Sequence, residues 1–191
     1  MPFTAIQNKP MYEGRKVTRE EYLDLEEDGF KYEMIDGVLY MSPSPFSSHG
    51  ECQINLGYCL RAFFIDRDAG KAISEVDIFL PDGGDVLRPD ITVVLKENYG
   101  IIKGHIHGVP DIVAEILSEA TQARDLGAKA ERYLFNGVKE YWIIDPDKKS
   151  IAIWINLDNK KWQKKDGNRM ESSALTGFIL QREEIFPSLK T

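Results

Sequence analysis

Three carboxylates stand in stretches of the sequence that otherwise have the character of apolar strands. Glu33 lies in "KYEMI", Asp90 opens "DITVVL" and Glu115 lies in "DIVAEIL". A buried carboxylate is costly unless it is paired or binds a metal. Hard oxygen donors that meet at one edge of a sheet suit Mg²⁺ or Mn²⁺, which activate water and stabilise in-line displacement at phosphorus. The three acids therefore predict metal-dependent chemistry on a phosphate ester.

Each carboxylate also has a purely structural interpretation. Asp90 could simply begin its strand, and Glu33 could alternate outward on an edge hairpin. Glu115 is the hardest to explain in this way, because apolar residues flank it on both sides. In an extended strand it shares one face with Val113 and Leu117. Glu115 is therefore the strongest of the three candidates.

A cation is usually needed near the attacking water or the phosphate, and Lys129 is the candidate. Asp125, Lys129 and Tyr133 follow one another at four-residue spacing on a predicted helix, with Arg132 alongside. The alternative is an ordinary surface pair between Asp125 and Lys129, worth a few tenths of a kcal/mol. Spacing alone leaves both interpretations open.

Other motifs that could carry chemistry are weak or absent. The sequence has no Walker loop, no G-x-G-x-x-G, no G-x-S-x-G and no H-E-x-x-H, which removes the best support for nucleotide kinases, Rossmann enzymes, α/β-hydrolases and zincins. His105 and His107 alternate as in a strand and form only a weak chelating pattern. His49, Cys52 and Cys59 lack an apparent fourth ligand, so a structural zinc is not expected. His49 could nevertheless face a cleft.

The elements that must position these residues follow from periodicity and turn signals. Thr18 and Glu21 form a capping-box pattern that opens a short helix to about Asp28. Asp36-Gly37 is a type I′ hairpin signal between two short strands. Periodicity further predicts a helix over 49–70 and strands over 71–80, 90–95, 111–117 and 140–145, with a mobile surface loop over 96–110. A second helix is expected over 123–136, capped by Ser118 or Thr121 and ended by Gly137. The chain is expected to close with a C-terminal β-meander.

The order of these elements predicts an α/β (α+β) fold. Strand 111–117, the helix after it and strand 140–145 form a right-handed βαβ crossover. One sheet of mixed parallel and antiparallel strands, flanked by helices, is the natural architecture. The aromatic residues Tyr141, Trp142 and Trp154 are expected to fill its core.

Length and composition bound the possibilities. The chain has 191 residues, of which 42% are hydrophobic, which predicts one domain over residues 1–191 with an irregular N-terminal arm at 1–16. No apolar run reaches membrane-spanning length and no signal-peptide core is apparent, so the cytoplasm is expected. The two cysteines are expected to be reduced. The net charge of −7 argues against a broadly basic nucleic-acid binder, but not against an enzyme that uses a metal ion and a local basic patch.

Several short motifs in order resemble the Uma-two endonuclease family of PD-(D/E)XK, restriction-endonuclease-like nucleases. They are "YEMIDG", "RPD", "PDIVAEILS" and "GVKEYWIIDP", and the resemblance runs from about Thr18 to Pro146. It implies a restriction-endonuclease-like mixed central sheet flanked by helices. It also implies that Asp90 is the Asp of the PD element, that Glu115 is the acid of (D/E)-x-K and that Glu33 is the additional Glu of the hairpin.

The sequence departs from the superfamily pattern at Leu117, where a lysine would stand two residues after Glu115. The resemblance implies that the lysine has migrated to the following helix, where Lys129 matches it. A long lysine stem from that helix could place its ammonium in the space left at position 117. The carbonyl of Ile116 would add a metal ligand.

The resulting prediction is a Mg²⁺- (or Mn²⁺-) dependent endonuclease that hydrolyses DNA phosphodiester bonds. Asp90, Glu115 and the Ile116 carbonyl would bind the metal, Glu33 would bind a second metal or orient water, and Lys129 would position water or offset transition-state charge. The expected partners are DNA, branched DNA or another nucleic acid, with no membrane.

A second copy of the chain is also expected. It would form a C₂ homodimer through an apolar surface of the C-terminal meander. Two alternatives to the endonuclease remain open. One is a non-catalytic nucleic-acid- or protein-binding module on a degenerate nuclease fold, and the other is hydrolysis of a smaller phosphoester.

Overall fold

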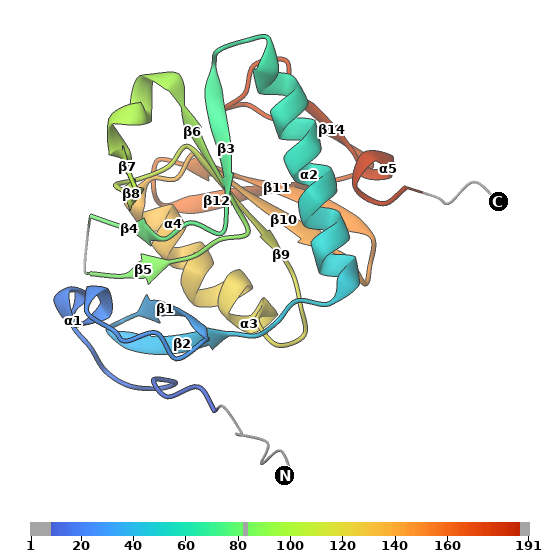
Figure 1. Ribbon diagram of the computed structural model, residues 1–191. Coiled ribbons are helices and arrows are strands. Elements are labelled where there is room, and N and C mark those ends of the chain that lie inside the picture. The colour runs from blue at the N-terminus through green and yellow to red at the C-terminus, as the bar shows by residue number, and fades with distance from the viewer. Residues whose placement is uncertain (1–8, 82–83, 188–191) are drawn as a thin grey trace.

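A computed structural model describes residues 9–81 and 84–187 of the chain (Figure 1). Its centre is a six-stranded sheet in the order β12-β11-β10-β9-β6-β3. The β9 and β10 strands are parallel, and the other neighbours are antiparallel. The strands are β3 (Gly70–Ser74), β6 (Ile91–Leu95), β9 (Ile112–Ile116), β10 (Glu140–Asp145), β11 (Ser150–Leu157) and β12 (Lys161–Asp166).

A second six-stranded sheet, in the order β2-β1-β5-β4-β8-β7, lies beside the first. This sheet contains the hairpin predicted at Asp36-Gly37. Both turn residues have positive φ (52° and 73°), as a type I′ turn requires. The strands are β1 (Lys31–Ile35), β2 (Val38–Ser42), β4 (Ile78–Phe79), β5 (Val86–Leu87), β7 (Ile102–Lys103) and β8 (His105–His107).

One helix covers one face of the central sheet, and a helical run together with the second sheet covers the other face. The α2 helix (Ser47–Ile65) buries one stripe of side chains against the face that carries Ile112, Ala114 and Ile116. The opposite face, which carries Val113 and Leu117, packs on a helical run and on the second sheet. That run consists of α3 (Gln122–Arg124), the π-helical turn η2 (Asp125–Lys129) and α4 (Ala130–Asn136). The alternation predicted for the strand of Glu115 is therefore confirmed.

The βαβ crossover is also as predicted, since β9, the helical run and β10 follow one another and the two strands pair in parallel. The run ends at Gly137, a left-handed residue with φ 91°, as the sequence indicates. Its start differs from the prediction, because the Thr121 side chain makes no capping hydrogen bond. Instead, the Ser118 carbonyl accepts the N–H of Gln122 (2.9 Å).

Several predicted boundaries are wrong. The strand expected over 71–80 is broken at Glu75, whose φ of 47° ends β3, and β4 then joins the other sheet. The loop expected over 96–110 contains a 3₁₀ helix, η1 (Lys96–Ile101), and the strands β7 and β8, with Ile106 fully buried. The first helix, α1 (Arg19–Leu23), has the predicted Thr18–Glu21 capping box but ends well before Asp28.

The described segments near both ends of the chain pack against the rest of the protein. In the described part of the N-terminal arm, Tyr12 is buried and the Gly14 N–H donates to the Leu39 carbonyl (2.8 Å); residues 1–8 lie outside the described part. At the other end, β11 and β12 extend the main sheet, and β13 (Arg169–Glu171), β14 (Ile179–Gln181) and α5 (Arg182–Ile185) follow. The apolar residues Ile151, Ile153 and Trp154 are buried in the core, whereas Ile155, Leu157 and Trp162 are partly exposed, and the dimer surface expected of the meander stays a prediction.

Cys52 and Cys59 are free thiols, as predicted. Burial raises the pKa of each thiol to about 11, which makes them unreactive packing residues. Within 9–81 and 84–187, the helices are all too short or too polar to cross a bilayer.

Candidate active site

The acidic residues singled out in the sequence come from three neighbouring elements. Glu33 is the central residue of β1. Asp90 directly precedes β6, and Glu115 lies on β9. Since β6 and β9 are antiparallel with Ile91 opposite Ala114, Asp90 and Glu115 stand at the same end of the pair.

Lys129 reaches into this cluster from the helical run. Its ammonium Nζ lies 2.6 Å from Glu115 Oε1, 3.1 Å from Glu33 Oε2 and 3.3 Å from Asp125 Oδ1. The lysine is only 3% exposed, and Glu115 is equally buried. The interpretation of Asp125 and Lys129 as a surface pair is therefore wrong, because both side chains are enclosed.

The π-helical turn that spans Asp125–Lys129 sets this geometry. A π turn is wider than an α turn and is frequent at functional sites. Asp125 and Lys129 both face inward from it, and Tyr133 continues the same face in α4, where its hydroxyl donates to Glu115 Oε1 (3.2 Å). The Tyr141 hydroxyl on β10 donates to the Asp125 carbonyl (3.0 Å), which fixes the turn to the central sheet.

The electrostatics of the cluster follow from its burial. Burial opposes the charge on Lys129, but the carboxylates of Glu115, Glu33 and Asp125 outweigh it and hold the pKa of the lysine well above its ordinary value. Burial also raises the pKa of Glu115 and Asp125, and the attraction of Lys129 only partly offsets this effect. Lys129 is therefore charged at neutral pH, and of its carboxylate neighbours Glu115 and Asp125 are harder to ionise than usual.

Asp90 is oriented by two other contacts. Its Oδ2 accepts the backbone N–H of Ile116 (2.7 Å), and its Oδ1 lies 3.2 Å from His49 Nε2. Although burial opposes it, the hydrogen bond to Asp90 and the charge of Asp90 raise the pKa of His49. His49 was only a minor candidate in the sequence, yet it lies in the cleft at the start of α2.

These groups line a cleft of about 580 Å³ between the hairpin, the start of α2 and the helical run. Glu33, Asp90, Glu115, Ile116 and Lys129 all contribute to its wall. The structure thus brings together the four predicted catalytic side chains and the predicted backbone ligand, Ile116. The roles assigned to them stay predictions.

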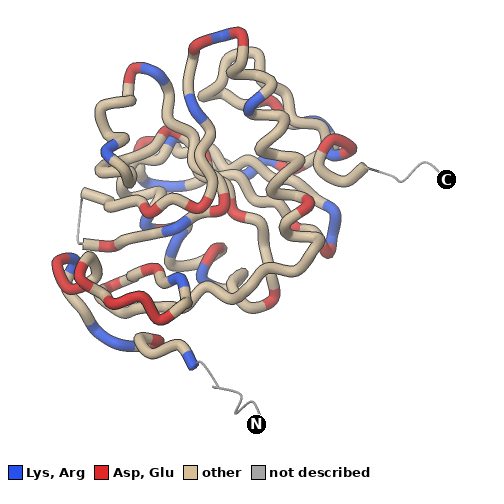
Figure 2. Tube along the Cα trace, in the orientation of Figure 1, with Lys and Arg blue, Asp and Glu red and all other residues tan. Residues whose placement is uncertain are grey.

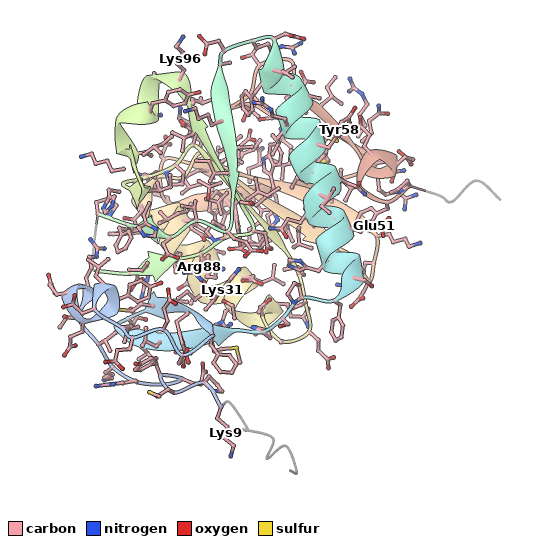
Figure 3. The ribbon with its side chains drawn as sticks, viewed as in Figure 1. Lys9, Lys31, Glu51, Tyr58, Arg88 and Lys96 are labelled. Carbon is pink, nitrogen blue, oxygen red and sulfur yellow. The ribbon has the colours of Figure 1, made fainter. Side chains whose placement is uncertain are left out.

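Basic residues also stand at the cleft. Lys31 and Arg88 line it and lie close together between the hairpin and α2 (Figure 3). Lys31 pairs with Glu75, and Arg88 Nε lies 2.6 Å from Asp77 Oδ1. Each cation is therefore partly neutralised by a neighbour.

Arg124 is a further cation that sequence reasoning missed. Its Nε lies 3.6 Å from Glu33 Oε1, and its guanidinium stacks on Tyr40, 5.1 Å from the ring centroid. The only sequence signal was its place one residue before Asp125. The His105–His107 pair, by contrast, lies elsewhere: His107 stacks on Phe79 and neither histidine lines the cleft.

The donor set fits a hard divalent cation. No three His, Cys, Asp or Glu side chains among the described residues are arranged as a ready ligand cage. Asp90 and Glu115 nevertheless line the same cleft beside the backbone of Ile116. Two carboxylates and a carbonyl, completed by water, are the kind of set that Mg²⁺ uses.

Two known proteins resemble this chain over most of its length. One similar protein is a crystal structure described as a putative nuclease belonging to DUF820 from Anabaena variabilis. The match covers 89% of this chain and 97% of that chain, with a TM-score of 0.75 and 21% sequence identity. An uncharacterized protein from Synechocystis sp. is 24% identical over 159 residues, which cover 82% of this chain and 83% of that protein. The first likeness shows the fold.

The family comparison covers most of the chain. Residues 19–183 match the Uma2 family model, which is described as a putative restriction endonuclease. That span contains all the residues of the cleft discussed above. The chain therefore belongs to the Uma2 family of putative restriction endonucleases.

Proposed function

We propose that the protein is a Mg²⁺- or Mn²⁺-dependent endonuclease that hydrolyses phosphodiester bonds of DNA. The description of the family and that of the structural neighbour support a nuclease function in general. The observation that carries the proposal is the buried Lys129 ammonium, 2.6 Å from Glu115 Oε1 in a cleft that Asp90 also lines.

In this proposal Asp90 and Glu115 hold the metal, together with the carbonyl of Ile116. The metal, when bound, lowers the pKa of water and offsets charge on the phosphate. Lys129 stabilises negative charge that develops at phosphorus, in a site where burial strengthens the interaction. Glu33, whose Oε2 lies 3.1 Å from the ammonium, orients Lys129 or a water molecule.

His49 and Arg124 complete the proposed site as positioning residues. His49 Nε2, 3.2 Å from Asp90 Oδ1, fixes the orientation of that carboxylate. Arg124 lies beside Glu33 and offsets the negative charge of that carboxylate, which also faces Lys129. We further propose that DNA contacts Lys31 and Arg88 at the rim, and that the protein acts as a homodimer.

Cleavage of supercoiled plasmid tests the proposal directly. The wild type, Asp90→Asn and Glu115→Gln are incubated with plasmid in Mg²⁺, in Mn²⁺ and in EDTA. Cleavage should need the metal and fall at least about 100-fold in either variant, since each loses a charge that the reaction uses. The matched control is Glu131→Gln, which neutralises an exposed carboxylate on α4 and should cleave like the wild type.

The same assay separates the alternatives. A protein that binds plasmid but never cuts it, in either metal, would instead be the non-catalytic module. Hydrolysis of bis-p-nitrophenyl phosphate with intact plasmid would favour a smaller phosphoester substrate. Equal cleavage by the wild type and both variants would contradict the assigned site.

A further inference from the structure

The outer face of α2 is unusually apolar for a face that no other element of the described residues covers. Ile54 and Tyr58 are each 73% exposed, and Ile65 is 61% exposed. Their spacing of four and seven residues places them on one side of the helix. The opposite side carries the stripe buried against the sheet, Cys52, Leu56, Leu60 and Phe64.

Two charged residues bracket the apolar pair on that outer face. Glu51 precedes Ile54 by three residues, and Arg61 follows Tyr58 by three. Both are exposed, and neither forms an ion pair within 9–81 and 84–187. Figure 3 shows Glu51 and Tyr58 on the side of α2 that faces away from the sheet.

The pattern of charged and apolar residues along this face is complementary to the same pattern on a second helix that runs in the opposite direction. When a second α2 lies antiparallel on the first, with the two-fold axis on the outer face at the level of residue 56, Glu51 faces Arg61 of the other copy and Ile54 faces Tyr58. Both charged pairs then have opposite signs, and both apolar contacts are repeated by symmetry. A parallel arrangement would instead place Glu51 on Glu51 and Arg61 on Arg61, which is repulsive.

We propose that this face of α2, formed by Glu51, Ile54, Tyr58, Arg61 and Ile65, binds a second copy of the chain as an antiparallel, two-fold helix pair. The 19-residue helix is about 28 Å long. One such helix pair buries less area than a standard interface, so the dimer dissociates on dilution. The surface differs from the β-meander, where Ile151, Ile153 and Trp154 are buried.

Sedimentation velocity of the full chain, at protein concentrations of about 1 µM to 1 mM, tests the proposal. These concentrations span the dissociation constants expected for a modest interface. The wild type should pass from monomer to dimer. Ile54→Asp should weaken association at least about 10-fold, because it places an unpaired charge in the apolar contact. Phe135→Asp, which alters an exposed apolar residue on α4 (65% exposed), is the control and should dimerise like the wild type.

Charge reversal decides the orientation. Glu51→Arg alone and Arg61→Glu alone should each weaken association, since each places like charges opposite one another. The double variant restores opposite signs and should return to within about 3-fold of the wild type, as a coupled pair does. The substitutions lie on the surface, and circular dichroism of each variant checks folding.

Three results would overturn the proposal, and none depends on nuclease activity. The first is a wild type that stays monomeric at the highest concentration. The second is a dimer that Phe135→Asp weakens while Ile54→Asp does not. The third is a double charge reversal that associates no better than the single variants.

Discussion

At the scale of single residues, the cleft depends on one lysine among three carboxylates. Lys129 contacts Glu33, Glu115 and Asp125, and all four side chains are buried. Breaking a buried ion pair by removing one partner costs much more than a surface pair is worth, because an unpaired charge remains buried. The cation should therefore matter for stability as well as for chemistry.

Replacing Lys129 with Met should destabilise the protein by about 3–5 kcal/mol at pH 7. The pKa of Lys129 is raised above 10.5, so its contribution is fully present at neutral pH and is lost only as pH rises through that raised value. Urea unfolding of the variant and the wild type at pH 7 measures the difference.

The loss of stability caused by Lys129→Met should become smaller at acidic pH. The pKa of Glu115 is raised above 4.5, so the carboxyl left without its cation begins to protonate above pH 4.5 and no longer carries a buried charge. The control is Lys96→Met, which removes an exposed lysine paired with Asp68 and should change stability by less than about 0.5 kcal/mol. A deficit independent of pH would contradict the assigned charges.

At the scale of elements, the helical run between β9 and β10 brings Lys129 to the site, and two of its glycines differ in role. Gly137 ends the run in a left-handed conformation with φ 91°, where a side chain is strained. Gly127 lies in the π turn at ordinary φ, and a Cβ there would meet nothing within 4 Å. The first requires glycine, and the second does not.

Gly137→Ala should therefore destabilise the protein by about 1 kcal/mol. Gly127→Ala should stabilise it by up to about 1 kcal/mol, because alanine loses less backbone entropy on folding. Thermal unfolding of the two variants side by side gives both signs. Destabilisation by Gly127→Ala would indicate that the π turn itself needs the freedom of glycine.

The elements that sequence reasoning missed share a cause. Ile106, flanked by exposed histidines, has the alternation of a strand, but three residues between glycines were too few to predict one. Strand 71–80 was wrongly predicted as continuous because nothing in its sequence marks Glu75 as a residue of positive φ. In both places the pairing partners, rather than local preference, decide the conformation.

At the scale of the whole molecule, the net charge of −7 must be reconciled with a polyanionic substrate. Figure 2 shows acidic and basic positions interspersed along the chain, with acidic residues gathered in α1 and the segment after it. The basic residues of the cleft are few and partly paired. Binding should therefore rely on the metal and a small number of phosphate contacts.

The salt dependence of DNA binding should be correspondingly shallow. With about two or three phosphates neutralised by groups such as Lys31 and Arg88, the logarithm of the association constant should fall with the logarithm of salt concentration at a slope of about −2 to −3. Fluorescence anisotropy of Glu115→Gln with a labelled duplex measures it. A slope near zero would contradict direct contact between these residues and phosphate.

Metal binding should stabilise the folded chain as a whole. At a Mn²⁺ concentration of about 100 times the dissociation constant, linkage gives about 2.7 kcal/mol. Differential scanning calorimetry should show a higher melting temperature for the wild type in Mn²⁺ and no such rise for Glu115→Gln. An equal rise in both proteins would place the metal elsewhere.

The sequence by itself determined the chemistry that the protein could carry. Carboxylates at Glu33, Asp90 and Glu115 stand out because acids are rare among buried apolar residues, and the turn residues Asp36-Gly37 and Gly137 end their elements as local conformation requires. Family resemblance linked these residues to Lys129. These conclusions needed only residue type, spacing and order.

Only the tertiary structure decided whether Lys129 belongs to the cluster. A four-residue spacing from Asp125 describes an exposed pair and a buried one equally well, since spacing fixes only which side chains share a face. Which face is buried depends on contacts between segments far apart in the chain. Here the π turn, packed under the hairpin and against β9 and β10, turns the ammonium toward Glu115 and Glu33.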